Sequence, residues 1–193
     1  LFIHKVDSSK DINVEEYFLE LKKNINKIDA LINNVGIAGP TGKLEDLQTE
    51  EWCKTIDVNV NSHFYFSKNA IPLLKIKGGS IINLSSTAGI FGFPLRTPYA
   101  ASKWAIIGLT KSAALEYAKT PIRINVLCPG WTETQMGQQG NIHDTDPRFL
   151  SDHVVGRSGN TNEIAETVLW LSSPLSSFVN GHAMIADGGR MAL

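Results

Sequence analysis

The stretch GSIINLSSTAGIFGFPLRTPYAASK, residues 79–103, contains the two signals that decide the fold of this chain. It begins with Ser80–Leu84, a short and almost continuous apolar run of the kind found in parallel strands buried on both faces. From Tyr99 onward the apolar residues follow the longer spacing of a helix. A buried strand, a loop and a helix in this order form the repeating unit of an α/β fold with a parallel sheet.

The same alternation extends over the whole chain. Apolar runs predict further strands at Leu1–Val6, Ala30–Asn33, Arg123–Cys128 and Ala183–Ala186. Helical spacing predicts helices at Val14–Asn26, Thr49–Leu74, Tyr99–Ala118 and Thr161–Leu171. The polar residues 135–158 are expected to form a long loop with at most one short helix. The sequence therefore predicts a single α/β domain over residues 1–193, with a doubly wound parallel sheet of the Rossmann type.

Charge and residue content exclude several classes of function. The net charge is −1, so no broad basic field is present to bind nucleic acid or an anionic membrane. No apolar run approaches the roughly 20 residues that a membrane span needs. Two cysteines, Cys53 and Cys128, make a disulfide framework implausible, which fits a cytoplasmic location. The five histidines do not have HExxH spacing, and the two cysteines are not paired in the sequence. No metal site is therefore predicted.

Tyr99 and Lys103 are candidate catalytic residues because their spacing places them on one face of the predicted helix. A tyrosine with a pKa near about 10 is a poor base at neutral pH, and a neighbouring cation favours its phenolate form. Such a pair is a credible general acid and base. On its own, this spacing also suits a packed tyrosine beside a solvated lysine.

Polar and glycine-containing segments follow three of the predicted strands. They are Asn-Asn-Val-Gly at 33–36, Ser86, and Cys-Pro-Gly at 128–130. The carboxyl ends of parallel strands share one edge of the sheet, where open α/β folds bind ligands. We therefore expect these segments to converge with Tyr99 and Lys103 on one site. Asn33 itself is expected to join neighbouring strands rather than to contact a ligand.

Taken together, the motifs resemble the short-chain dehydrogenase/reductase family along essentially the whole chain. The NNVG motif at 33–36 resembles the family's NNAG, with Val35 in place of alanine. Asn59, Ser86, Tyr99 and Lys103 match the family's Asn, Ser and YxxxK positions. PGWTET at 129–134 resembles the PGxxxT loop, and Asp187-Gly188-Gly189 resembles the late DGG motif.

The resemblance implies a hydride transfer between NAD or NADP and a small or medium alcohol or ketone, a small-molecule substrate. In that reaction Tyr99 would be the acid or base, and Lys103 would lower its pKa and hold the nicotinamide ribose. Ser86 would orient the substrate oxygen, and Asn59 would anchor a water between Lys103 and solvent. The resemblance further implies a homodimer or homotetramer.

Residues that the resemblance assigns to the cofactor lie in three segments. Asp7, with Ser8 beside it, matches the position that contacts adenine, although Asp7 also suits a solvated carboxylate at a strand end. The adenosine ribose would meet Asn34, Val35 and Gly36, and the carboxamide and pyrophosphate would meet Pro129, Gly130, Thr132 and Thr134.

Other side chains are candidates for contact with the substrate. Those expected to face it are Thr87, Ile90, Phe93 and Trp131, together with the loop at 135–158. Arg96 suits either an anionic substrate or a salt bridge at the surface or an interface.

One family motif is absent. The TGxxxGxG turn, which cradles pyrophosphate after the first strand, does not occur in the sequence. By the resemblance, the chain lacks the first βαβα portion, whose two strands would separate Leu1–Val6 from Ala30–Asn33. The segment that meets the adenosine 2′ position belongs to that portion, so NAD and NADP both remain open.

A binding or regulatory protein with the same fold and an idle site remains an alternative, because fold does not dictate function. A serine hydrolase is disfavoured, since no GxSxG motif surrounds Ser80, Ser85 or Ser86.

We predict that the 193 residues alone fold poorly or bind a dinucleotide weakly, because strand edges next to the missing portion would lack hydrogen-bond partners. Titration of NADH and of NADPH into the chain tests this expectation. Micromolar affinity for either dinucleotide would contradict it.

Overall fold

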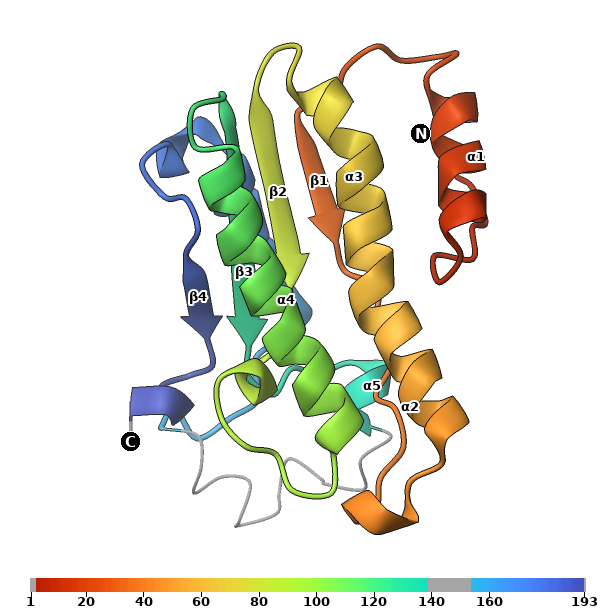
Figure 1. The fold of residues 1–193 in the computed structure, drawn as a ribbon. Coiled ribbons are helices and arrows are strands. Elements are labelled where there is room, and N and C mark those ends of the chain that lie inside the picture. Colours follow the sequence, from red (N-terminus) through yellow and green to blue (C-terminus); the bar gives the residue numbers. More distant parts are fainter. Residues whose placement is uncertain (1–2, 139–153, 193) are drawn as a thin grey trace.

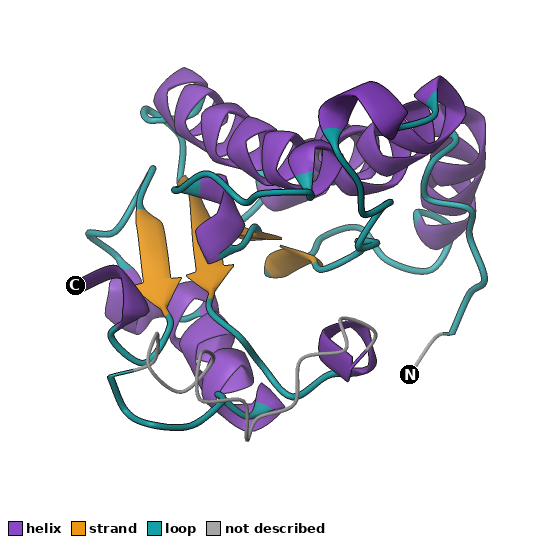
Figure 2. Cartoon of the chain, turned by 90° about the horizontal axis from the view of Figure 1, so that it is seen from below, coloured by secondary structure: helices purple, strands orange, loops and turns teal. Residues whose placement is uncertain are grey.

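The computed structural model describes residues 3–138 and 154–192, and these form three layers with one sheet in the middle (Figure 1). All strand pairs are parallel, in the order β1-β2-β3-β4. The strands are Ala30–Asn33 (β1), Gly79–Leu84 (β2), Ile122–Pro129 (β3) and Ala183–Ala186 (β4). Their carboxyl ends lie at the lower edge in Figure 1, and Figure 2 views the molecule from that edge.

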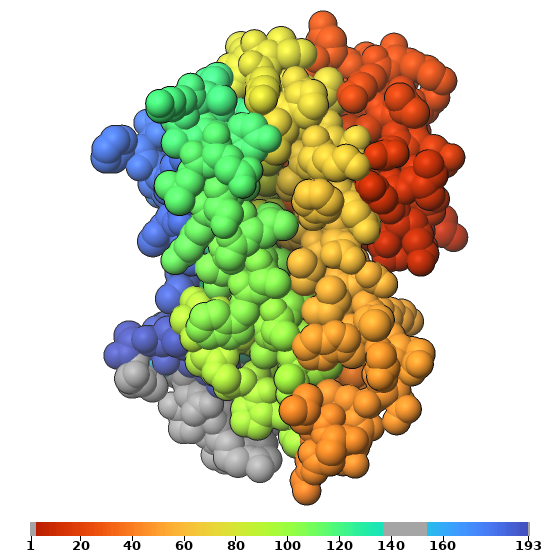
Figure 3. All heavy atoms as spheres, in the orientation of Figure 1, coloured from red at the N-terminus to blue at the C-terminus, as the bar shows by residue number. Residues whose placement is uncertain are grey.

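Helices cover both faces of the sheet, which confirms the doubly wound arrangement (Figure 2). One face carries Asp11–Leu21 (α1), Thr49–Ile56 (α2), Ser62–Leu74 (α3) and Thr97–Glu116 (α4). In the space-filling view α3 and α4 adjoin, and α1 lies against α3 (Figure 3). The other face carries Thr161–Ser172 (α7), and Gln135–Gln138 (α5) is a short helix below the sheet. No helix among residues 3–138 and 154–192 is long and apolar enough to cross a membrane.

Most of the predicted elements are confirmed, with ends that differ by a few residues. The prediction of a strand at Leu1–Val6 is wrong for residues 3–6, which form no strand, while residues 1 and 2 lie outside the described part. A strand needs a neighbouring strand for its N–H and C=O groups, and no described strand pairs with these residues. The far edge of β1 is likewise unpaired in the described part of the chain, as expected.

The helix predicted as one element at Thr49–Leu74 is divided. A five-residue π-helical segment, Asp57–Asn61 (η2), separates α2 from α3. Such an insertion shifts the positions of side chains on the following helix, and π segments occur frequently at functional sites. The first helix also begins and ends earlier than predicted, at Asp11 and Leu21.

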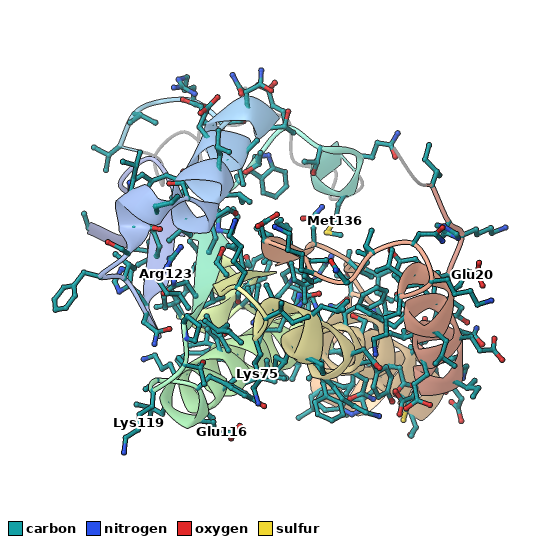
Figure 4. The ribbon with its side chains drawn as sticks, turned by 90° about the horizontal axis from the view of Figure 1, so that it is seen from above. Glu20, Lys75, Glu116, Lys119, Arg123 and Met136 are labelled. Carbon is teal, nitrogen blue, oxygen red and sulfur yellow. The ribbon has the colours of Figure 1, made fainter. Side chains whose placement is uncertain are left out.

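Apolar side chains fill both interfaces of the sheet. Leu74, Ile81, Ile106 and Val126 are inaccessible to solvent between the sheet and the layer of α3 and α4. On the other face, Leu171 of α7 packs with β2 and β3. The C-terminus of α7 is held by Arg123, which extends from β3 and donates to the carbonyl oxygens of Leu171 and Ser173, each at 3.0 Å (Figure 4).

A chain of buried polar groups crosses this core. Asn33 Nδ2 donates to Asn83 Oδ1 at 2.8 Å and to Ser67 Oγ at 3.1 Å, so Asn33 joins β1 to β2 and to α3, as expected. Asn83 Nδ2 in turn donates to Thr110 Oγ1 of α4 at 2.9 Å. Because Asn33 and Asn83 are register partners, these bonds fix the pairing of β1 with β2.

His63 of α3 is buried beside this polar chain, with 1% of its surface exposed. Burial, and the nearby charge of Lys103, lower the pKa of His63 to about 3. At pH values between about 3 and 6.5, His63 binds a proton in the unfolded chain and does not bind it in the folded chain.

We predict that the free energy of unfolding falls as the pH drops below about 6.5, and that His63→Gln reduces this dependence by up to about 1.4 kcal/mol per pH unit. Urea denaturation at a series of pH values between 6.5 and 4.5 measures it. His182→Gln, at an exposed histidine, is the control. Equal slopes for the wild type and His63→Gln would show that the folded protein accommodates the imidazolium.

Candidate active site

Ser86, Tyr99 and Lys103 lie where β2 ends and α4 begins. Ser86 follows β2, and its Oγ accepts a hydrogen bond from Ala88 N at 3.1 Å, which caps the short turn Thr87–Gly89 (η3). Pro98 suits the first turn of α4, where a backbone N–H has no helical acceptor, and the helix therefore begins at Thr97. Tyr99 and Lys103 then lie one turn apart, with Lys103 Nζ 5.5 Å from the centre of the Tyr99 ring.

A cavity of about 510 Å³ opens at this edge of the sheet. Its walls come from the ends of β1, β2 and β3, from the start of α4 and from α7. Nine of the residues proposed from the sequence line it: Asn34, Gly36, Ser86, Tyr99, Lys103, Pro129, Gly130, Thr132 and Thr134. The structure thus brings the three strand-end segments and the Tyr–Lys pair together.

The other four sequence-derived candidates do not line this cavity. Asp7 lies on the surface near α1, where its Oδ1 accepts hydrogen bonds from Ser9 N at 3.1 Å and Ser9 Oγ at 2.6 Å. These bonds lower the pKa of Asp7. Ser8 is half-buried beside it, and Val35 is 44% exposed. The fourth, Asn59, is fully buried behind the cavity wall.

Asn59 uses its whole side chain to hold the loop after β1. Its Oδ1 accepts from Ile37 N at 2.7 Å, and its Nδ2 donates to Ile37 O and Ser102 Oγ, each at 3.0 Å. The π-helical segment places Asn59 where it can reach both partners. These bonds join the loop that contains Gly36 to α4, so the side chain of Asn59 positions the cavity wall. Its expected role in anchoring a water stays a prediction.

Burial dominates the electrostatics of Tyr99 and Lys103. It raises the pKa of Tyr99, while a hydrogen bond with Ser86 and the charge of Arg96 partly offset this rise. Burial also lowers the pKa of Lys103 to about 8. Ser86 and Arg96 act to lower the pKa of Tyr99. The expected effect of Lys103 on this pKa stays a prediction.

Arg96 joins two segments beside the cavity, and a contact with an anionic substrate or a salt bridge at an interface stays a prediction. Its Nη1 donates to Thr41 Oγ1 and its Nη2 to Ala38 O, each at 2.9 Å, so it fastens the loop after β1 to the start of α4. Within the described ranges it forms no ion pair and does not line the cavity. Its guanidinium carbon lies 5.7 Å from the centre of the Tyr99 ring.

The substrate side of the cavity agrees only in part with the sequence. Thr87, Phe93 and Trp131 line it, but Ile90 packs into the core against Ile106 and Val126. The described parts of the loop 135–158 contribute Met136 of α5, and residues 139–153 lie outside the described residues. Sequence reasoning missed the lining residues Phe91, Thr161, Ile164, Ala165, Val168 and Arg190. The apolar spacing in α7 could have indicated Ile164, Ala165 and Val168, because the apolar face of this helix continues from the sheet to the cavity.

A family model described as "Enoyl-(Acyl carrier protein) reductase" matches residues 2–190. The chain belongs to the short-chain dehydrogenase/reductase family. It is 37% identical to 2-(S)-hydroxypropyl-CoM dehydrogenase 3 of Xanthobacter autotrophicus, over 97% of this chain and 75% of that protein. It is 39% identical to trans-4-hydroxycyclohexanecarboxylate dehydrogenase of Sinomonas cyclohexanicum, over 86% of this chain and 61% of that one. The solved structure of ElxO with NADP bound superposes with a TM-score of 0.91 at 30% identity, covering 98% of this chain and 78% of ElxO.

As a member of this family the chain is an NAD(P)-dependent oxidoreductase. Two features of the cavity fit a nicotinamide dinucleotide. The buried Lys103 ammonium has three N–H groups, and Leu84 O, at 3.0 Å, is its one hydrogen-bond acceptor among the described residues. A Cβ at Gly36 would lie 3.5 Å from both Lys103 Nζ and Asn59 Oδ1, so glycine keeps the space beside the ammonium open.

We predict that Asn59→Ala lowers the free energy of unfolding by about 2 to 4 kcal/mol, because Ile37 and Ser102 lose buried hydrogen-bond partners. Chemical denaturation measures this change. Asn69→Ala is the matched control, since Asn69 bonds only to Tyr65 O of its own helix among the described residues. A loss no larger than that of the control would mean that solvent replaces the bonds of Asn59.

Proposed function

We propose that this protein transfers a hydride between NAD or NADP and a small or medium alcohol or ketone, with Tyr99 as the acid and base. The observation that carries the proposal is the meeting of Ser86, Tyr99 and Lys103 in one cavity at the carboxyl edge of a parallel sheet. That edge is where α/β folds of this type bind ligands. The nicotinamide, when bound, supplies or accepts the hydride at the substrate carbon.

The phenol of Tyr99 carries the proton. In reduction its hydroxyl donates a proton to the carbonyl oxygen of the substrate, and in oxidation the phenolate accepts the proton of the alcohol. Burial favours the neutral phenol at neutral pH, since the pKa of Tyr99 is raised. Ser86 donates a second hydrogen bond to the substrate oxygen and fixes the direction from which Tyr99 meets it. No covalent bond to Ser86 forms.

Lys103 supports this proton transfer from the neighbouring turn of α4. With its pKa near 8, the ammonium form predominates at neutral pH, and its charge stabilises the phenolate when it forms. Its remaining N–H groups would bind the ribose hydroxyls of the cofactor. Asn34, Val35, Gly36, Pro129, Gly130, Thr132 and Thr134 are proposed as further cofactor contacts, and Asp7 and Ser8 as contacts of its adenine.

Cavity size and lining support a substrate of modest size. A volume of about 510 Å³ is within the usual range for small-molecule sites. Much of the cavity lining is apolar and aromatic, with Phe91, Phe93 and Trp131.

We extend the proposal to a homodimer or homotetramer, because Phe64 of α3 and Trp104 of α4 are about half exposed, at 50% and 52%. A cytoplasmic location stays a prediction.

We predict that Tyr99→Phe lowers kcat/KM at least about 100-fold in the full-length protein while leaving cofactor affinity nearly unchanged. Absorbance of the reduced nicotinamide, followed with a panel of alcohols and ketones, measures the rate. Tyr117→Phe is the matched control, because this tyrosine lies at the other end of α4 beneath Lys75. Wild-type protein that binds the cofactor and transfers no hydride would support an idle binding or regulatory protein instead.

A further inference from the structure

Arg190 is held at the cavity by a turn with a defined shape. The carboxylate of Asp187 accepts from Gly189 N at 3.0 Å and from Met191 N at 2.8 Å, so both of its oxygens are engaged within the turn. Gly188 has a φ of 64°, and a Cβ there would lie 2.6 Å from the side chain of Val155. The turn therefore requires glycine, and it leads directly into the short helix Arg190–Ala192 (η5).

The guanidinium of Arg190 lies over an aromatic ring of the same cavity. Its central carbon is 4.9 Å from the centre of the Phe91 ring, and Phe91 packs edge-on against Phe93 at 6.2 Å. All three residues line the cavity that contains Ser86 and Tyr99. The five N–H donors of a guanidinium lie around its edge, enough for a carboxylate as well as for protein partners.

The charges that line the cavity have one sign. Among the described lining residues the charged ones are Lys103 and Arg190, and no carboxylate side chain is present. Lys103 is buried in the wall beside Tyr99, and it bonds to Leu84 O. Arg190 is half-buried, on a different element, within a largely apolar lining that strengthens its attraction for an anion.

We propose that Arg190, held over the ring of Phe91, binds a carboxylate of the substrate, which makes the substrate a hydroxy acid or the corresponding oxo acid. The reacting hydroxyl or carbonyl then lies at Ser86 and Tyr99, and the carboxylate lies at the other end of the molecule. A guanidinium suits this group because it donates two parallel hydrogen bonds to a carboxylate. The inference rests on the proposed function and adds the chemical class of its substrate.

The test compares a carboxylate with a neutral molecule of the same shape in the full-length protein with its cofactor. The probes are 4-hydroxycyclohexanecarboxylate and its carboxamide, and 3-hydroxybutanoate and its amide. Competitive inhibition by cyclohexanecarboxylate and by cyclohexanecarboxamide is measured against whichever alcohol the enzyme oxidises fastest. The inhibition constants report on Arg190 even when none of the probes is a good substrate.

We expect the wild type to favour each carboxylate, as substrate or inhibitor, by at least about 10-fold over its amide. Arg190→Gln should weaken binding of the carboxylates about 10- to 100-fold, mainly through KM and the inhibition constant, and change the amides less than about 2-fold. Arg190→Lys keeps the charge and should retain part of the preference. Thermal unfolding of each variant checks that it is folded.

Lys75→Gln is the matched control. Lys75 also places a cation over an aromatic ring, 5.1 Å from the centre of Tyr117, but it follows α3 at the end of the sheet opposite to the cavity (Figures 1 and 4). This variant removes the same charge from the protein without touching the site, and it should leave the preference for carboxylates unchanged.

Two outcomes overturn the inference, and they differ in what they leave standing. The first is that the wild type turns over or binds carboxylates and amides equally, or that Arg190→Gln weakens the binding of both alike. Arg190 then does not bind the substrate carboxylate, and the proposed function survives. If no alcohol or ketone is turned over by the wild type, the proposed function fails and the inference fails with it.

Discussion

Two hydrogen bonds between β2 and α4 hold the site together. Lys103 Nζ donates to Leu84 O at 3.0 Å, and Ser85 Oγ donates to Lys103 O at 2.8 Å. The two bonds are reciprocal, because each segment supplies one side-chain donor and one carbonyl oxygen. They fix the first turns of α4, and therefore Tyr99, against the end of β2 and the segment after it that contains Ser86. The approach is so close that a Cβ at Gly89 would lie 2.8 Å from Lys103 O.

Satisfied polar groups in the interior give this arrangement its uniqueness. Asn33 and Asn83 bond to each other in one register only, which adds to the register preference that the buried apolar faces provide. Asn59 does the same for the loop after β1, since it pairs with both the N–H and the C=O of Ile37. Each buried amide is costly without its partners, so a displaced loop or strand loses more than the bond itself.

The strands and the Tyr–Lys pair could be predicted from the sequence because their signals are local. A buried strand shows as an apolar run, and a YxxxK spacing places two side chains on one helix face wherever the helix lies. The failures come from non-local interactions. Residues 3–6 have a strand-like sequence and no described strand to pair with, while Asn59 in the π-helical turn bonds to Ile37 and Ser102, which are distant in the sequence. The partners of Arg96 and the position of Arg190 over Phe91 likewise arise only when distant segments meet.

Burial acts on Tyr99 and Lys103 in opposite directions. It raises the pKa of the phenol and lowers that of the ammonium to about 8, because it disfavours the charged form of each group. The phenol is therefore held in its protonated form, the form that donates a proton to a carbonyl in the function we propose. Oxidation in that proposal uses the phenolate, and Ser86, Arg96 and the Lys103 ammonium lie near the Tyr99 side chain. Deprotonation of Lys103 above pH 8 would remove one of the nearby positive charges, so the two directions of the proposed reaction place different demands on the same pair.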